Sequence, residues 1–178
     1  MRTGELVGLQ WIDIDFFGKF ITVRRAVVRR RIVETKTDKV RKIDMSDALA
    51  AELKKLKRHR QEQWLAKGQT EIPKWVFCAE NGNFFDPFNL KDRYFYKCLE
   101  KAGLRRIRFH DLRHTFATLL LQNGESLAYV KDQLGHSSIR MTVDVHGHLV
   151  PGANRQAVNK LPSLDESGPI ELPLKGQQ

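Results

Sequence analysis

The 178-residue sequence has only two cysteines, Cys78 and Cys98, which are too few for a disulfide framework or a four-thiolate zinc site. It also lacks any run of 18 consecutive apolar residues, which argues against a membrane-spanning helix, and its first residues contain no apolar signal core. The composition is 41% hydrophobic and 29% charged, which is typical of a globular protein. We therefore expect a cytoplasmic protein with reduced thiols and no membrane partner.

Acidic residues are scarce relative to basic ones, because 21 Asp and Glu stand against 31 Lys and Arg, giving a formal net charge of +10. The surplus is concentrated in residues 1–60, which contain 16 basic and 8 acidic side chains. A basic surplus gathered in one segment is typical of a protein that binds a polyanion, so nucleic acid is the favoured partner. A globular protein that is basic without such a partner remains the alternative.

The hydrophobic pattern divides the chain into a strand-rich part and a helical part. Between Ile12 and Met45 the period is two, which predicts a small antiparallel sheet of about three strands near the N-terminus, built from segments 20–23, 26–28, 32–33 and 40–43. Helical spacing and capping residues then predict helices over 46–68, 87–102, 110–123, 126–134 and from 137 or 138 to 145. The fold class that follows is α+β, predominantly helical.

Residues 110–118, HDLRHTFAT, are the most informative stretch for chemistry. His110 and Arg113 are three residues apart, so they lie on one side of the first turn of a helix, where free backbone N–H groups also favour an anion. A capped helix with a surface arginine and a core histidine is the alternative. Apolar residues at helical spacing predict the buried side of this helix: Phe109, Leu112, Phe116 and Leu119 or Leu120.

Five boxes in register, the first together with the segment that follows it, resemble the C-terminal catalytic domain of the tyrosine recombinases, or phage integrases. Arg2–Leu6 resembles the R-x-G-E-L box of that family, and Leu9–Asp15 resembles the segment that follows it. Thr35–Thr37 is similar to the segment that carries the hairpin lysine. The runs HDLRHTFATLLLQNG, VKDQLGHSS and TVDVHGH resemble the remaining boxes in order. The resemblance covers nearly all of 1–160, and an ordered set of motifs is far more specific than any one of them.

The resemblance implies a site for one DNA phosphate. Members of the family cut one strand by attack of a tyrosine hydroxyl on a backbone phosphate, and the 3′-phosphotyrosyl link is later resealed to another strand. By resemblance, Arg2 and Arg113 bind the phosphate, for which the planar guanidinium fork is suited. His110 and His136 would form hydrogen bonds to the phosphate or transfer protons.

Lysines near the predicted hairpin tip complete the implied set. Lys36 would be the general acid that protonates the departing 5′ oxygen, with Lys39 as a substitute, and both would contact DNA. No metal, nucleotide or other cofactor is implied, because the phosphoester energy is kept in the covalent intermediate. The implied partners are double-stranded DNA and further copies of this chain assembled on it.

The nucleophile position departs from the family. The pattern T-x-x-x-Y-x-H corresponds to Thr142–His148, and His146 stands where the family has tyrosine. An imidazole nitrogen can attack phosphorus but lies closer to the backbone than a phenol oxygen, and a misplacement of about 1 Å can reduce a rate about a hundredfold. Our hypothesis is that strand cutting is lost or crippled while DNA binding survives. A non-catalytic DNA-binding remnant is the alternative.

The domain organisation also follows from the resemblance. We expect a catalytic-type domain over 1–161 and a loose tail over 162–178, which contains three prolines and two glycines. We expect the family's N-terminal helical DNA-binding domain to be absent, since the matched boxes begin at Arg2. DNA affinity would then depend largely on phosphate contacts and fall steeply with salt.

A histidine-ligated metal site is the less favoured alternative. His110 and His114 are four residues apart on one helix face, as in H-E-x-x-H zinc hydrolases, and His136, His146 and His148 could add ligands. However, Asp111 stands where that motif has its glutamate base. Arg113 also places a cation beside the ligands, which opposes binding of a doubly charged ion.

Overall fold

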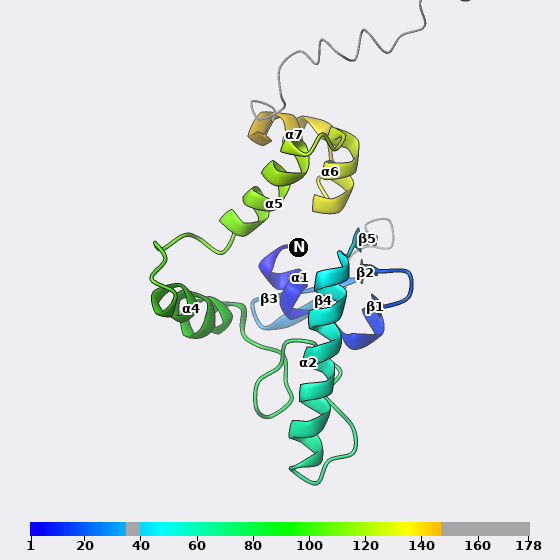
Figure 1. The fold of residues 1–178 in the computed structure, drawn as a ribbon, viewed down its shortest axis with the longest axis vertical. Coiled ribbons are helices and arrows are strands. Elements are labelled where there is room, and N and C mark those ends of the chain that lie inside the picture. Colours follow the sequence, from blue (N-terminus) through cyan, green and yellow to red (C-terminus); the bar gives the residue numbers. More distant parts are fainter. Residues whose placement is uncertain (35–39, 147–178) are drawn as a thin grey trace, which may run out of the picture.

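The computed structural model describes residues 1–34 and 40–146, and Figure 1 shows their arrangement. Lys36, Lys39, His148 and the predicted tail over 162–178 lie outside the described residues. A group of three helices near the C-terminal end lies beside a body that contains the strands and the longest helix. No helix within the described ranges is long and apolar enough to cross a membrane.

The strands form two small antiparallel sheets where the sequence predicted one. β1 (Ile14–Asp15), β2 (Phe20–Val23) and β5 (Arg41–Asp44) form a sheet in the order β1-β2-β5. β3 (Arg25–Val28) and β4 (Arg31–Glu34) pair only with each other and form a separate ribbon. β1 and β5 occupy the two edges of β2, so β3 cannot pair with the strand that it follows in the chain.

The body around the three-stranded sheet contains the first hydrophobic core. α1 (Thr3–Val7) and η1 (Trp11–Asp13) precede the sheet, and α2 (Asp47–Leu65) follows it. Ser46 caps α2 by accepting a hydrogen bond from the Leu49 backbone N–H at 3.2 Å, as the sequence predicted. The core cluster joins residues of η1, the sheet and α2 with residues of the connecting segments: Leu9, Trp11, Ile14, Ile21, Met45, Ala50, Leu53 and Val76.

The segment predicted as one helix over 87–102 is divided. α3 (Pro87–Asn89) is followed by a wider turn of π-helix, η3 (Leu90–Phe95), and then by α4 (Tyr96–Lys101). The Asp86 side chain caps α3 by accepting from the Phe88 backbone N–H at 2.8 Å. The sequence therefore predicted a helix in the right place, but it did not predict its division into three segments.

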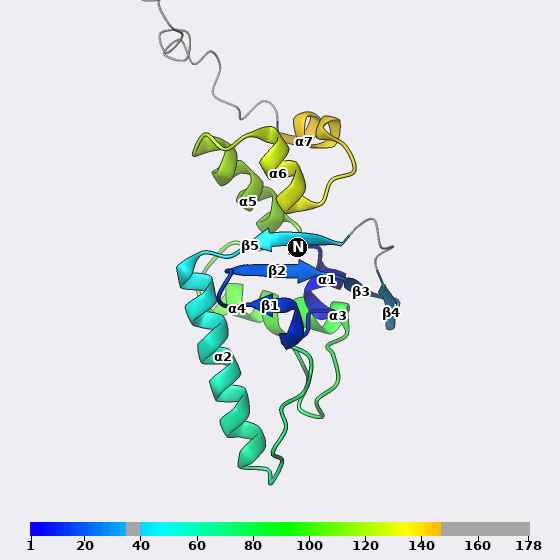
Figure 2. The same cartoon turned by 90° about the vertical axis from the view of Figure 1, so that its right-hand side faces the viewer.

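The last helices form a second core. α5 (Asp111–Gln122), α6 (Leu127–Leu134) and α7 (Ile139–His146) pack around Ala117, Leu121, Val130 and Leu134. The predicted buried side of α5 was largely wrong: Leu112 is 44% exposed, Phe116 41% and Leu119 54%, and only Leu120 packs against this core. The reason is that α6 covers the face of α5 that carries Ala117 and Leu121, which follow Phe116 and Leu120 by one residue. Figure 2 shows this group above β5, with α6 nearest the strand.

Candidate functional site

Arg113 lies in the first turn of α5 and is buried, with 8% of its surface exposed. Its Nη2 donates a hydrogen bond to the carbonyl oxygen of Leu134, and its buried Nη1 has no hydrogen-bond partner among the described residues. Burial lowers the pKa of Arg113 to about 10, so the guanidinium is still charged at neutral pH. The cations Arg2 and Arg41 act in the same direction. A buried cation whose N–H donor has no hydrogen-bond partner is suited to bind an anion.

Arg2 approaches the same turn from the start of the chain. Its Nη2 donates to the carbonyl oxygen of Gly135 at 3.3 Å, next to the carbonyl that Arg113 uses. Its backbone N–H donates to Glu5 Oε2 at 2.7 Å and its Nη1 to Glu5 Oε1 at 3.3 Å. The two arginines that the sequence singled out therefore meet on consecutive carbonyls of the turn between α6 and α7.

Glu5 and Arg41 form a buried ion pair that sequence reasoning did not place in the site. Arg41 Nη1 and Nη2 donate to Glu5 Oε1 and Oε2 at 3.1 and 2.8 Å, and Glu5 is only 4% exposed. Burial alone would raise the pKa of Glu5, but the hydrogen bonds from Arg41 and from the backbone of Arg2 keep it below its usual range. The signals were present, since Glu5 follows Arg2 by three residues and Arg41 lies in a predicted strand.

Because Gly135 has no side chain, the Arg41 side chain can lie directly against this turn. Gly135 has φ +68°, and a Cβ built on it would lie 2.5 Å from Arg41 Nε and 2.6 Å from Arg41 Cζ. A side chain here would be strained by the left-handed conformation and would push the Arg41 guanidinium from its place beside Glu5. The turn from Leu134 to His136 thus holds Arg2, Arg41 and Arg113 close together.

His136 connects the turn to α7. Its Nδ1 lies 2.9 Å from Oγ1 of Thr142, which is completely buried. Residue 146 is the last of α7, one helical turn after Thr142, although the His146 side chain lies outside what the structure describes. The helix that ends at residue 146 is therefore joined to the turn on which the arginines meet.

His110 precedes α5 and lies beside both Arg113 and His114. The His110 and His114 rings are 4.8 Å apart between centroids and nearly perpendicular. Burial lowers the pKa of His110, and the charges of His114 and Arg113 lower it further, which favours a neutral imidazole. A neutral imidazole can both donate and accept a hydrogen bond.

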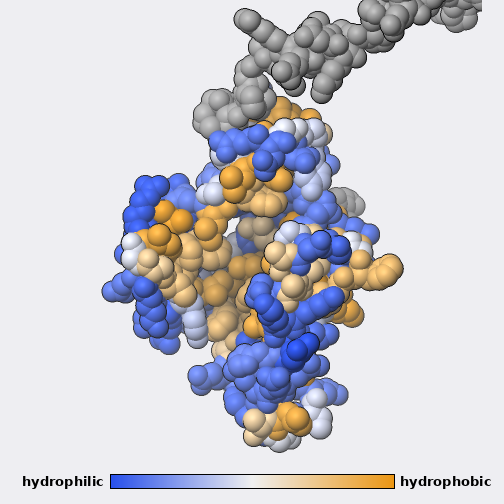
Figure 3. Space-filling view, viewed as in Figure 1, coloured by the Kyte–Doolittle hydropathy of each residue, from blue (hydrophilic) through white to orange (hydrophobic). Residues whose placement is uncertain are grey.

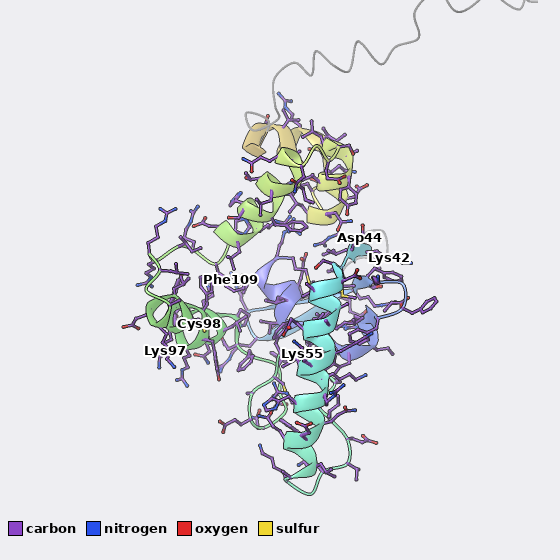
Figure 4. All side chains as sticks on the ribbon, viewed as in Figure 1. Lys42, Asp44, Lys55, Lys97, Cys98 and Phe109 are labelled. Carbon is purple, nitrogen blue, oxygen red and sulfur yellow. The ribbon has the colours of Figure 1, made fainter. Side chains whose placement is uncertain are left out.

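A cavity of about 480 Å³ opens between α1, the sheet and the start of α5. His110 and Arg113 stand on its wall, and Leu112 and Phe116 also line it, which accounts for their exposure. Figure 3 shows a hollow with apolar walls at this place. Figure 4 labels Phe109 beside the start of α5 and Asp44 at the end of β5 that faces α6, and both also line the cavity.

The structure thus brings together four of the residues that the sequence singled out, namely Arg2, His110, Arg113 and His136. Lys36 and Lys39 lie outside the described residues, so their place in the site stays a prediction. Within 1–34 and 40–146, no three His, Cys, Asp or Glu side chains gather to hold a metal ion, so the described residues give the metal alternative no support.

Comparisons with known proteins point to one family. The sequence profile of the phage integrase family matches residues 1–149. A tyrosine recombinase XerC-like protein of Caldanaerobacter subterraneus is 33% identical over 92% of this chain and 46% of its own length. The ICEBs1 integrase of Bacillus subtilis is 31% identical, with the same two coverages. This chain therefore spans about half the length of the curated relatives it matches.

Solved structures agree with the sequence comparison. The integrase of the transposon Tn1549, in complex with circular intermediate DNA, is similar with a TM-score of 0.70 and 25% identity over 91% of this chain and 56% of that one. XerA recombinase is similar with a TM-score of 0.66 and 26% identity, over 89% of this chain and 50% of its own. The predominantly helical α+β architecture predicted from the sequence is that of these neighbours.

Proposed function

We propose a function for this chain from its family, because the chain belongs to the phage integrases, or tyrosine recombinases. The proposed function is to bind double-stranded DNA in site-specific recombination or integration. Residues 1–161 would form the catalytic-type domain, and the tail over 162–178 would stay outside it. We also propose that it acts in the cytoplasm, where its DNA would be, and that several copies assemble on the DNA. Sedimentation of the protein with and without a duplex tests the assembly.

The convergence of Arg2 and Arg113 on one turn is the observation that carries this proposal. Both guanidinium groups stay oriented by carbonyls, at Gly135 and Leu134, while the buried Nη1 of Arg113 has no hydrogen-bond partner within the described ranges. Such preoriented cations stabilise the negative charge that grows on phosphate oxygens during strand transfer. His110 and His136 would add hydrogen bonds to the phosphate. Lys36, or Lys39 in its place, would protonate the departing oxygen.

Strand cutting is the step that we propose is lost or crippled. In the family reaction the tyrosine oxygen bonds to phosphorus as the bond from phosphorus to the 5′ oxygen breaks, and the tyrosine proton leaves while the 5′ oxygen gains one. Position 146 holds histidine. Its nitrogen would have to reach the phosphorus from a shorter side chain, and about 1 Å of misplacement reduces the rate about a hundredfold.

An adduct assay tests the cutting step. The protein and the variants H146Y and H146F are incubated with a pool of nicked duplexes whose sequence is randomised around the nick, and covalent protein–DNA complexes are counted on denaturing gels. We expect H146Y to form adduct, H146F to form none, and the unaltered protein to form about a hundredfold less than H146Y. Adding R113Q to H146Y should abolish the adduct. Equal adduct from the unaltered protein and H146Y would contradict the loss of cutting.

DNA affinity tests the binding function separately. Fluorescence anisotropy with a random-sequence duplex should show binding whose affinity falls steeply between about 50 and 200 mM salt, as phosphate contacts require. Binding without any adduct from H146Y would favour the alternative, a DNA-binding remnant without catalysis. An affinity that barely changes with salt would contradict the phosphate site itself.

A further inference from the structure

The β3–β4 ribbon turns through two arginines in an unfavourable backbone conformation. Val28 pairs with Arg31, so the loop consists of Arg29 and Arg30 alone, and their φ angles are +48° and +62°. Two-residue loops with φ positive at both positions are dominated by Asn-Gly, because a Cβ is disfavoured in the left-handed region. Local stability therefore does not explain arginine at either position.

The ribbon is also strongly basic and has no acidic residue before Glu34. Residues 24–33 contain five arginines, and no acidic residue occurs from 16 to 33. At the tip, Arg29, Arg30 and Arg31 are all exposed. Arg30 Nε contacts Asp86 Oδ2 at 3.0 Å, yet its side chain remains 79% exposed. Across 1–34 and 40–146, Arg29 and Arg31 make no ion pair, so the tip presents unneutralised positive charge.

A close contact fixes the root of the ribbon to the helix that begins after Arg2. A Cβ built on Gly4 would lie 2.6 Å from the carbonyl oxygen of Val27, so α1 can lie on β3 only because Gly4 has no side chain. Val27 is 2% exposed at this contact, whereas all four residues of β4 are exposed. Figure 2 shows the ribbon beyond the edge of the sheet, on the side away from α2. The tip therefore projects from the scaffold that positions Arg2.

We propose that the Arg29–Arg31 tip is a second DNA contact, which binds backbone phosphates beside the one held by Arg2 and Arg113. The inference rests on the proposed function, since it presumes that DNA lies across that site. A strand rises about 3.4 Å per residue, so the tip lies about 10 Å from the start of β3, a reach comparable with the width of a DNA groove. Duplex DNA carries one charge per about 1.7 Å of its axis, so phosphates lie within range. Such contacts add affinity without reading sequence.

The turn offers a variant that separates binding from stability. R29N/R30G removes two positive charges and installs the residues that this loop conformation favours, so the melting temperature should rise by a few degrees. Affinity for a random-sequence duplex should fall about tenfold or more at about 100 mM salt. The slope of log K against log salt should become shallower by about 2. The matched control K55Q/R58Q removes two exposed charges from α2, and its affinity and slope should change much less.

Three results would overturn the proposal. Affinity and salt slope unchanged in R29N/R30G would show that the tip does not touch DNA. An equal loss in K55Q/R58Q would show that only net charge matters. A lower melting temperature in R29N/R30G would show that the arginines stabilise the turn. Failure of the proposed function appears differently, as an absence of salt-dependent DNA binding by the unaltered protein, and it would remove this inference as well.

Discussion

Both Nη atoms of Arg41 donate to the carboxylate of Glu5, at 3.1 and 2.8 Å, and so join β5 to α1 in the interior. The same carboxylate accepts from the backbone N–H of Arg2 at 2.7 Å. A residue proposed to hold phosphate is thus oriented by a buried anion, which is itself held by a second arginine. The Glu5–Arg41 pair has no role in the chemistry proposed above, but it determines where Arg2 lies.

Removing the charge of Glu5 should destabilise the fold strongly. In E5Q, Arg41 keeps its charge at only 15% exposure of its side chain and loses its carboxylate partner. Loss of one member of a buried pair typically lowers the free energy of unfolding by about 3–5 kcal/mol. Urea denaturation measures this change. The control is E52Q, whose carboxylate contacts Lys55 in an exposed pair, and it should change the free energy of unfolding by less than about 1 kcal/mol. Equal effects in both variants would contradict the role of the pair.

Gly135 should be much less tolerant of substitution than another glycine of similar conformation. Gly103 has φ +64° and a Cβ on it would meet nothing within 4 Å, whereas Gly135 has φ +68° and its Cβ would meet the Arg41 guanidinium. G103A should therefore show only the backbone penalty, about 1 kcal/mol, and G135A clearly more. Denaturation of the two variants isolates the contact with Arg41. A difference close to zero would mean that Arg41 moves aside without penalty.

Local signals allowed the sequence to predict many features of the helices. Ser46 and Ser126 each accept a hydrogen bond from the backbone N–H three residues later, and Gly135 ends α6 in the left-handed conformation. Each of these features depends on residues within a few positions of one another, so spacing is enough to find it. The four strand segments were found for the same reason.

Features that depend on distant partners were missed. The sequence could not tell that β3 and β4 leave the main sheet, because strand pairing is decided by the whole fold. Nor could it tell that Phe116 lines a cavity while Ala117 is buried, since only the position of α6 decides between adjacent faces. The Glu5–Arg41 pair likewise joins residues on separate elements. Glu5 belongs to the first sequence box and Arg41 to a predicted strand, so nothing in the sequence indicated that the two side chains pair.

His110 should titrate below the usual range of histidine. Burial, His114 and Arg113 all disfavour its charged form, so its pKa in the free protein lies below 6.5. Below about pH 6.5 the unfolded chain binds a proton at His110 more readily than the folded chain does. Protonation of His110 therefore lowers the free energy of unfolding as pH falls. A phosphate beside it favours the charged form, so duplex DNA should raise the pKa. NMR titration of the imidazole, assigned with H110Q, measures both values. A pKa at or above 6.5 without DNA would contradict the observed surroundings.

Tyr129 and Asp44 hold α6 against β5. The Tyr129 hydroxyl donates to Asp44 Oδ2 at 2.8 Å, and the Gln133 side chain donates to the same oxygen at 3.1 Å. Burial raises the pKa of Tyr129 to about 12, and the hydrogen bond and charge of Asp44 contribute in the same direction. In the unfolded chain the hydroxyl titrates near 10. Because the folded pKa is the higher one, this stabilisation is complete below about pH 10 and is lost as pH rises through about 12.

The variant Y129F should reveal that pH window. Near neutral pH it should unfold about 1 kcal/mol more easily than the unaltered protein, because the hydrogen bond to Asp44 is gone. Between about pH 10 and 12 the difference should shrink, since only the unaltered protein then loses the stabilisation from its tyrosine. Y94F is the matched control, because Tyr94 packs its ring on Phe85 and lies on a different element. If the difference in free energy of unfolding between Y129F and the unaltered protein stays constant across this range, the folded protein does not raise the pKa of Tyr129.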